Sequence, residues 1–325
     1  MQANPISPFD QVDTSSGVCT VDGWGVKIHV HHGHLIVEDG VGRSRRTRRY
    51  HKATSGLRRL VIIGHSGYIT FEASRWLADA KIQAFHLDSD GRILSVSAQS
   101  PNLPAPRRAQ ARAITGPAGL EIIRYLLSLK VAGQRELAVR LVGQAPDIDS
   151  AIEAIEQATD LDILRIAEAQ AAVAYWHSWS NVEVRFVRAD RSKVPEHWLT
   201  FGQRRSPQSA SGRRAINPIN AVLNYLYALL EAEARIAAIA VGLDPGLGIL
   251  HLDKKSRDSF ALDLMEAGRP AVDAYVLDLV EGHVFRRSDF NETRAGITRI
   301  APTLHISSPT PQPSGTNIWP YLPSR

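Results

Sequence analysis

The pattern of apolar and polar residues changes about one third of the way along the chain. In residues 18–97 the apolar positions alternate with polar ones or form short runs, as at 26–31, 34–38 and 60–63, which is typical of β-strands. From residue 114 onward they recur every three or four positions, which predicts helices over 114–142, 148–175, 218–241 and 258–267. The sequence therefore predicts an α+β fold, with a small N-terminal β-rich domain followed by a larger all-α domain.

Proline-rich segments mark the boundaries of these domains. Residues 100–108 contain three prolines and predict a linker, and residues 301–325 hold six of the 18 prolines of the chain. We therefore expect four segments: a β-rich domain at 1–99, a linker at 100–113, an α-helical domain at 114–300 and a flexible Pro-rich tail at 301–325.

Composition excludes several classes of protein. Hydrophobic residues make up 44% and charged residues 22% of the chain, which fits a folded globular protein. A single cysteine, Cys19, rules out an intrachain disulfide and a multi-cysteine zinc site. No run of about 18 apolar residues predicts a membrane span, and the N-terminus lacks the features of a secretory signal. We expect a cytoplasmic protein without membrane contact.

Basic residues are concentrated in two regions, and this points to a polyanionic partner. Residues 1–115 carry 15 basic and 9 acidic residues, and residues 185–214 carry eight basic and two acidic residues. Nucleic acid is the simplest partner for such patches, although a solvated arginine-rich surface explains the charge equally well. The arginines predicted to contact phosphates are Arg204, Arg205, Arg213 and Arg214, with Arg43, Arg45 and Arg46 as a second group.

Two glutamates lie among apolar neighbours on predicted helices. Glu168 and Glu233 each have leucine, isoleucine or alanine residues three, four or seven positions away. A buried carboxylate is unfavourable unless it is paired, protonated or bound to a cation. A glutamate at the edge of the core is the plainer interpretation of either residue. The periodicity alone does not choose between the two glutamates.

A second acidic group precedes the end of the helical region. Asp263 and Glu266 are three residues apart and share a helix face, where two like charges favour a bound cation. His251 comes shortly before them. Carboxylates with a histidine form a ligand set that suits Mg²⁺ or Mn²⁺. The alternative is a solvated acidic pair neutralised by Arg269, one turn further on.

Four segments resemble, in order, the motifs of one known family. They are 168–172 followed by Tyr175-Trp176, N-P-I-N-A at 217–221, G-L-D-P-G-L-G-I-L-H at 242–251, and A-L-D-L-M-E at 261–266 followed by Arg269-Pro270. The series resembles the CRISPR-associated endonuclease/integrase family Cas1, whose members insert new spacers into CRISPR arrays. The resemblance covers about residues 15–300 and is weaker in the N-terminal part.

The resemblance implies which glutamate belongs to the site, a choice that the periodicity leaves open. It implies that Glu168, His251 and Glu266 are catalytic and bind Mg²⁺ or Mn²⁺, with Asp263 close by as a weaker ligand or a neighbour of the ligands. Glu233 then has a structural role. The resemblance also implies that the helical domain is the catalytic one. It further implies a homodimer, two copies of which hold a dimer of the small partner Cas2.

The function expected on this basis is a metal-dependent DNA endonuclease/integrase of CRISPR adaptation. Its substrates are double-stranded protospacer DNA and CRISPR repeat DNA, and its chemistry is attack of a 3′-hydroxyl on a phosphodiester, or hydrolysis. A non-catalytic DNA-binding scaffold is the main alternative, but a scaffold has no need of a metal-ligand set. A small-molecule hydrolase on the same metal leaves the basic regions unexplained.

Overall fold

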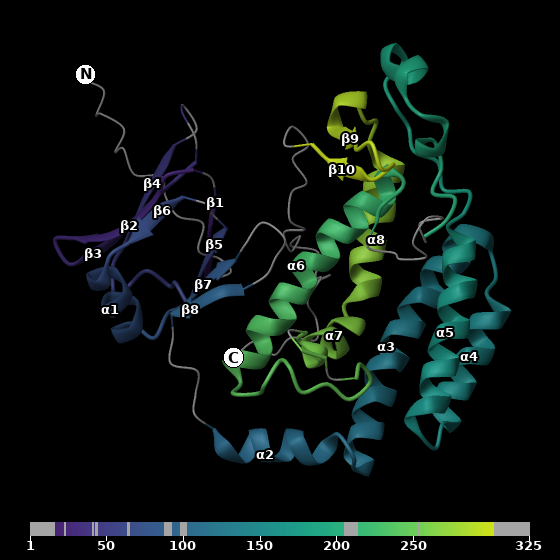
Figure 1. Cartoon of the computed structure of the whole chain (residues 1–325), viewed down its shortest axis with the longest axis horizontal. Helices are drawn as coiled ribbons and strands as arrows, with labels where there is room; N and C mark the ends of the chain where they lie inside the picture. Colours follow the sequence, from purple (N-terminus) through teal and green to yellow (C-terminus); the bar gives the residue numbers. More distant parts are fainter. Residues whose placement is uncertain are drawn as a thin grey trace, which may run out of the picture. The chain divides into compact units, whose positions relative to one another are not determined.

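The computed structural model of the chain (Figure 1) describes residues 17–22, 24–40, 42, 45–63, 66–87, 93–97, 103–204, 214–252, 254–255 and 257–301. The chain forms two compact units. One comprises Met1–Asn102 with Ala240–Gly242, and the other comprises Leu103–Ile239 with Leu243–Arg325. Strands dominate the first unit and helices the second, so the predicted α+β class is confirmed.

The described part of the first unit contains two four-stranded sheets and one helix. One has the order β1-β5-β7-β8, in which only β8 is antiparallel to its neighbour. The other has the order β4-β3-β2-β6, in which only β6 is parallel to its neighbour. The elements are β1 (Val18–Asp22), β2 (Val26–His31), β3 (His34–Asp39), β4 (Arg46–Tyr50), β5 (Arg59–Ile63), β6 (Gly67–Ile69), α1 (Phe71–Asp79), β7 (Gln83–Leu87) and β8 (Ile93–Ser97).

Among the described residues of this unit, the core is apolar apart from one buried carboxylate, Asp39. Alternate residues of the strands, such as Ile28 and Leu35, pack with Leu77 of α1. Asp39 is completely buried beside the guanidinium groups of Arg46 and Arg48, which neutralise it. This cluster therefore belongs to the packing of the sheet.

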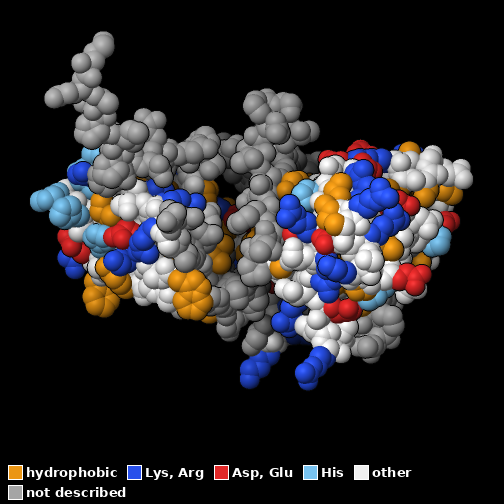
Figure 2. Space-filling view, turned by 90° about the horizontal axis from the view of Figure 1, so that it is seen from above, with side chains coloured by type: hydrophobic (Ala, Val, Ile, Leu, Met, Phe, Trp, Pro, Cys, Tyr) orange, Lys and Arg blue, Asp and Glu red, His pale blue; other side chains and the backbone are white. Residues whose placement is uncertain are grey.

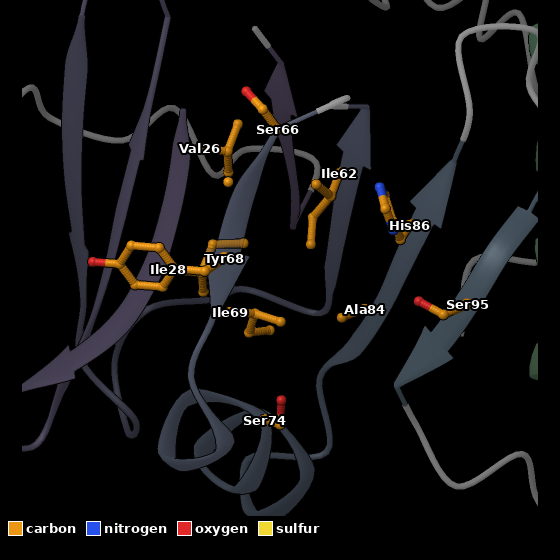
Figure 3. Close-up of a pocket in the computed structure, with 11 residues that line it drawn as sticks. Val26, Ile28, Ile62, Ser66, Tyr68, Ile69, Ser74, Ala84, His86 and Ser95 are labelled. Carbon is orange, nitrogen blue, oxygen red and sulfur yellow. The ribbon is translucent and has the colours of Figure 1, made fainter. Parts of the chain in front are cut away.

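A cavity of about 240 Å³ opens on the inner face of the sheets in this unit (Figure 3). Aliphatic side chains such as Ile28 and Ile62 line it, together with His86 and a few serines. The described residues that line the cavity include no acidic side chain.

Helix α3 is the central element of the second unit, where it contacts α4, α5, α7 and α8. Proline at the first turn starts α3, α4 and α8, a position where the missing N–H costs nothing. Asp160 caps α5 through hydrogen bonds from two backbone N–H groups. The elements are α2 (Pro104–Ala113), α3 (Pro117–Val142), α4 (Pro146–Gln157), α5 (Leu161–Ser178), α6 (Pro218–Ala240), α7 (Ser259–Glu266), α8 (Arg269–Gly282), β9 (Phe290–Glu292) and β10 (Thr298–Ile300).

A glycine lets α3 approach the junction of α7 and α8. A Cβ on Gly133 would lie 2.5 Å from Cβ of Pro270, a separation that real side chains do not reach. Gly133 follows Lys130 by three residues on α3, and Pro270 of α8 follows Glu266, the last residue of α7, by four. The close contact therefore brings these two stretches of charged residues together.

Two features differ from the sequence expectation. The proline-rich stretch expected as a linker contains helix α2, because Pro104 and Pro106 lie in its first turn, where proline is tolerated. The end of the helical region also contains the short strand pair β9 and β10. The predicted flexible tail at 301–325 lies outside the described residues, apart from Ala301. No helix of the described ranges is both long and apolar enough to span a bilayer.

Candidate active site

Lys130 joins two of the predicted site residues. Its ammonium nitrogen is 2.5 Å from Glu168 Oε1 and 2.5 Å from Glu266 Oε2. The two carboxylate oxygens are therefore at most twice that distance apart, although they come from α5 and α7. Lys130 belongs to α3, which contacts both helices. Three helices thus bring the two glutamates together around one ammonium group.

Burial and charge act in opposite directions on these groups. Burial raises the pKa of Glu266, but Arg269 and Lys130 outweigh this effect and lower the pKa to about 2. Burial lowers the pKa of Lys130, while Glu266 and Glu168 raise it, and the resulting pKa lies above the ordinary value. Arg269 donates from Nε to Glu266 Oε1 at 2.9 Å. Glu266, Lys130 and Arg269 are therefore all charged at neutral pH.

Asp263 fixes the orientation of His251. It is buried and accepts hydrogen bonds from the backbone N–H groups of Ile249, Leu250 and His251, at 2.6, 3.1 and 3.0 Å. Its Oδ1 also accepts a hydrogen bond of 2.6 Å from His251 Nδ1. Because Nδ1 is the donor, Nε2 is the imidazole nitrogen that can bind a metal ion. The oxygens of Asp263 are thus engaged with the loop that carries His251.

Helix α5 holds the loop of His251 close to Glu168. Arg165 lies one turn before Glu168 and donates to the carbonyl oxygen of Leu250 from Nε at 3.3 Å and from Nη2 at 3.1 Å. Leu250 is the residue before His251. The His251 ring also lies within electrostatic range of Glu266. These contacts bring His251 towards the two glutamates.

The loop is anchored at its other end by α2. Gln110 is buried; its Nε2 donates to the carbonyl oxygen of Asp244 at 2.7 Å, and its Oε1 accepts from Asp244 N at 2.9 Å. Inside the loop, a Cβ on Gly248 would lie 2.5 Å from the carbonyl oxygen of His251 and 2.5 Å from Cβ of Ser259. Only glycine fits this fold of the loop. The glycine-rich G-L-D-P-G-L-G-I-L-H motif is therefore a device for placing the histidine.

The donors fit a hard divalent cation. Two carboxylates and one imidazole suit Mg²⁺ and Mn²⁺. Glu266 Oε2 is buried, and the ammonium of Lys130 lies 2.5 Å from it. Within the described ranges, no three His, Cys, Asp or Glu side chains are grouped closely enough to hold a metal ion. The ammonium of Lys130 occupies the space between the two glutamates.

A buried acid on α8 is connected to this site through a tyrosine. Asp273 is completely buried and accepts hydrogen bonds from the hydroxyl groups of Tyr175, at 2.8 Å, and Tyr227. Burial raises the pKa of Asp273 to about 6, against the lowering effect of the two hydroxyl groups. The guanidinium of Arg269 lies 4.6 Å from the centre of the Tyr227 ring. The tyrosine thus connects Asp273 to the arginine that pairs with Glu266.

The asparagines of the N-P-I-N-A motif hold the segment that precedes α6. Asn217 accepts a hydrogen bond from Asn220 N at 2.9 Å and so caps the helix. Its Nδ2 donates to the carbonyl oxygen of Phe201 at 2.5 Å, and Asn220 Nδ2 donates to that of Gln203 at 2.8 Å. The motif is therefore a structural element that fixes residues 201–204 against α6.

The arginines predicted to bind DNA have different environments. Arg204 donates to Asn220 and Asn224 at 2.9 and 2.8 Å, and its guanidinium lies 5.3 Å from the Trp176 ring centre and 5.5 Å from that of Tyr227. Its guanidinium is thus packed into the helical unit. Arg214 is exposed. Figure 2 shows lysine and arginine side chains on the visible face of the helical unit, with acidic side chains among them.

The arginines of the β-rich unit are engaged with nearby acids. Arg45 donates to Glu38 at 3.2 Å and to the carbonyl oxygen of Gly25 at 2.9 Å. Arg46 donates to both oxygens of Asp39, at 3.0 and 2.9 Å. Arg43, Arg205 and Arg213 lie outside the described residues. DNA contact by any of the seven arginines stays a prediction.

Glu231 of α6 pairs with an arginine of its own helix. Glu231 Oε1 accepts a hydrogen bond of 2.6 Å from Arg235, the predicted pair at a spacing of four residues. Arg235 also pairs with Asp258. Glu233 is partly buried on the same helix. The contacts with Lys130 involve Glu168 of α5, the helix that the sequence resemblance selected.

Fold and site together define a class: a two-unit α+β protein whose helical unit assembles carboxylates and a histidine from separate helices and a loop. The family model described as CRISPR associated protein Cas1 matches residues 19–301. The chain therefore belongs to the Cas1 family.

Curated relatives agree with this assignment. The chain is 33% identical to a CRISPR-associated endonuclease Cas1 of Pyrobaculum aerophilum over 270 residues, which cover 80% of this chain and 82% of the relative. It is 28% identical to one of Archaeoglobus fulgidus, with 83% of this chain and 79% of the relative covered. With one of Rhodospirillum rubrum the identity is 34%, but the match spans 58% of this chain and 56% of the relative's length.

Solved structures share the fold. A casposase bound to its integration product is 27% identical, with a TM-score of 0.66, covering 88% of this chain and 79% of that one. A Cas1 protein from Thermotoga maritima has a TM-score of 0.64 at 17% identity, covering 88% of this chain and 85% of that one. A partial Cas6-RT-Cas1–Cas2 complex has a TM-score of 0.60 at 19% identity, covering 88% of this chain and 83% of that one.

Two buried groups of the site were missed by sequence reasoning. Lys130 lies on the apolar face of α3, between Leu127 and Val131, where an unpaired lysine is unfavourable. That position is a signal that a buried partner exists. Asp273 similarly lies between buried positions of α8. Neither signal identifies the partner, because the partners lie 38 or more residues away.

Proposed function

We propose that this protein is a metal-dependent DNA endonuclease/integrase of CRISPR adaptation. The observation that carries the proposal is the convergence of Glu168 and Glu266 around one cation, with His251 held nearby, in a chain of the Cas1 family. Its substrates are double-stranded protospacer DNA and the repeat DNA of a CRISPR array.

The proposed reaction exchanges one phosphodiester bond for another. The oxygen of a DNA 3′-hydroxyl forms a bond to a phosphorus atom of the target strand and loses its proton. The bond between that phosphorus and the 3′-oxygen of the target breaks, and the leaving oxygen takes up a proton. When water replaces the 3′-hydroxyl, the same exchange is hydrolysis.

Glu168, Glu266 and His251 Nε2 would hold a Mg²⁺ or Mn²⁺ ion. When bound, such an ion lowers the pKa of the attacking hydroxyl and neutralises charge that develops on the phosphoryl group. Asp263 keeps the imidazole in the tautomer that presents Nε2. Arg165 and Gln110 fix the loop that carries the histidine. The protein thus contributes rigid placement of the ligands from two helices and one loop.

The partners are proposed on the same basis. Relatives named above include a casposase bound to an integration product and a complex that contains Cas1 and Cas2. We infer that this chain acts on DNA as a homodimer together with a Cas2 dimer. The excess of basic residues in the first 115 positions supports a DNA partner.

The decisive test replaces Glu168 with glutamine, which keeps the volume and removes the charge. We expect Glu168→Gln to reduce strand transfer into a leader–repeat DNA by about a hundredfold or more, because loss of a metal ligand removes several kcal/mol of transition-state stabilisation. Mn²⁺ binding should weaken strongly, while DNA affinity in a salt titration should change little.

Glu233→Gln is the matched control, because it removes the same charge from a partly buried position on α6. A folded Glu233→Gln variant should integrate DNA at the wild-type rate. Wild-type strand transfer by Glu168→Gln would instead show that Glu168 is a structural carboxylate and not a metal ligand. Inactivity of Glu233→Gln alone would mean that the metal ligand lies on α6.

A further inference from the structure

Lys130 is a buried cation for which the proposed reaction has no assigned role. Its side chain is 7% exposed, and it extends from the middle of α3 to carboxylates on two other helices. Ordering and desolvating a lysine is unfavourable unless strong ion pairs compensate. The ion pairs with Glu168 and Glu266 supply that compensation.

The two glutamates in turn need a cation between them. They carry like charges on separate helices, and their repulsion would drive α5 and α7 apart. Arg269 relieves only part of this repulsion, because it donates to Oε1 of Glu266. Oε2 of Glu266 and Oε1 of Glu168 both have Lys130 as their cationic partner.

The contacts of Lys130 and Arg269 with Glu266 differ in kind. Arg269 is a planar guanidinium that makes a directed hydrogen bond of 2.9 Å. Lys130 is a compact ammonium that lies 2.5 Å from Oε2 and also donates a hydrogen bond to Glu168. An ammonium on a flexible four-carbon chain can leave such a contact by rotating its side chain. Lys130 is therefore the exchangeable cation of the pair.

We propose that Lys130 is the internal counter-cation of the active site, which holds Glu168 and Glu266 together before a divalent cation binds and competes with that cation for the same two oxygens. This inference rests on the proposed function, since it takes Glu168 and Glu266 as metal ligands. Lys130 is then a positioning residue that keeps the ligands assembled and lowers the affinity of the site for metal.

The test measures Mn²⁺ affinity of the full-length protein, by electron paramagnetic resonance of free Mn²⁺ at equilibrium. Lys130→Met removes the charge and keeps a flexible apolar chain of similar length. We expect Mn²⁺ to bind at least about tenfold more tightly, because a competing positive charge within ion-pair distance is gone. The rise in melting temperature on adding Mn²⁺ should also be larger than in the wild type.

Arg124→Met is the matched control. It removes one positive charge from the same helix, and Arg124 donates to the carbonyl oxygen of Ala158 rather than to a site carboxylate. Its Mn²⁺ affinity should equal that of the wild type. An unchanged or weaker affinity in Lys130→Met would overturn the inference, since the lysine would then not compete with the metal.

Loss of folding is also informative. If Lys130→Met folds only when Mn²⁺ is present, the ion replaces the lysine as counter-charge, which supports the inference. If the variant stays unfolded with and without Mn²⁺, the two cations are not interchangeable and the inference is overturned. Glu168→Gln separates this failure from failure of the proposed function. Its Mn²⁺ affinity falls if Glu168 is a ligand, and it stays at the wild-type level only if the proposed metal site itself is wrong.

Discussion

An acidic cluster of the β-rich unit and one of the helical unit are built on different principles. In the β-rich unit, Asp39 faces two guanidinium groups, and Arg46 occupies both of its oxygens with hydrogen bonds. In the helical unit, Glu168 and Glu266 share the ammonium of Lys130, and one oxygen of Glu266 has no hydrogen bond. The first cluster has more cations than acids and is closed, whereas the second leaves ligand oxygens available.

Exposure reinforces the difference. The side chain of Asp39 is 0% exposed, while those of Glu168 and His251 are 26% and 30% exposed. A closed cluster of directed hydrogen bonds contributes to the stability of one sheet. A partly open cluster held by an ammonium can exchange its cation for a ligand. Burial of an acid is therefore a weak indicator of function, and the availability of its oxygens is a stronger one.

The largest effect that tests this comparison is on stability of the β-rich unit. Asp39→Asn leaves Arg46 and Arg48 beside a neutral group, and removal of one partner of a buried pair costs about 3–5 kcal/mol. Because the Arg46 side chain is 47% exposed, we expect the lower end, about 3 kcal/mol. Hydrogen exchange of peptides covering β3 and β4 should show roughly a hundredfold loss of protection.

The helical cluster provides the counterpart to this measurement. Glu168→Gln should leave the protection of α5 within about 1 kcal/mol of the wild type, because Glu266 remains as a partner of Lys130. Folded Asp39→Asn protein should retain strand transfer. The distinction between the two clusters would be wrong if Asp39→Asn and Glu168→Gln lost hydrogen-exchange protection and strand transfer in the same proportion.

The elements of the fold could be predicted from the sequence, because their signals are local. The apolar period and Pro218 at the helix start predicted α6 closely, and the hairpin of β2 and β3 follows from alternation around Gly33. The segment of α2 was missed, because its prolines indicated a linker while their position in a first helical turn permits a helix.

The site was predictable only in part, because its charge balance depends on distant residues. The motifs that contain Glu168, His251 and Glu266 could be aligned with a family pattern without any structure. Lys130 could not be connected to them, since its partners follow it by 38 positions and more, on helices whose packing the sequence does not give. The same applies to Asp273, whose two tyrosine partners lie 98 and 46 positions before it.

The buried acid Asp273 adds a test of the comparison through its pH dependence. The pKa of Asp273 is raised from 3.8 to about 6, so the folded state binds its proton more tightly than the unfolded state. Its contribution to stability is therefore complete below the unfolded value and is lost as pH rises through about 6. The free energy of unfolding, relative to Asp273→Asn, should fall by about 2–3 kcal/mol between about pH 4 and about pH 7.

Urea unfolding followed by circular dichroism at the helical band measures this difference, since the helices are concentrated in the second unit. Asp273→Asn keeps a carbonyl oxygen that one tyrosine hydroxyl can still reach. Parallel stability curves for the two proteins would show that Asp273 is not perturbed. In that case Asp273 would not form a class of its own between the closed cluster of Asp39 and the open cluster of Glu168 and Glu266.

The smallest effect is expected at an acid that belongs to neither cluster. Glu231 pairs with Arg235 along one face of α6, and its side chain is 30% exposed. Glu231→Gln should change the free energy of unfolding by about 0.3–0.5 kcal/mol, because a helical ion pair at this spacing is weak and Arg235 keeps Asp258 as a partner. Urea unfolding at low and high salt measures it, and the difference should shrink at high salt, where such a pair is screened. If Glu231→Gln lost as much free energy of unfolding as Asp39→Asn, side-chain exposure would not separate the acids of this protein. The distinction between closed, open and solvated carboxylates would then have to rest on hydrogen-bond geometry alone.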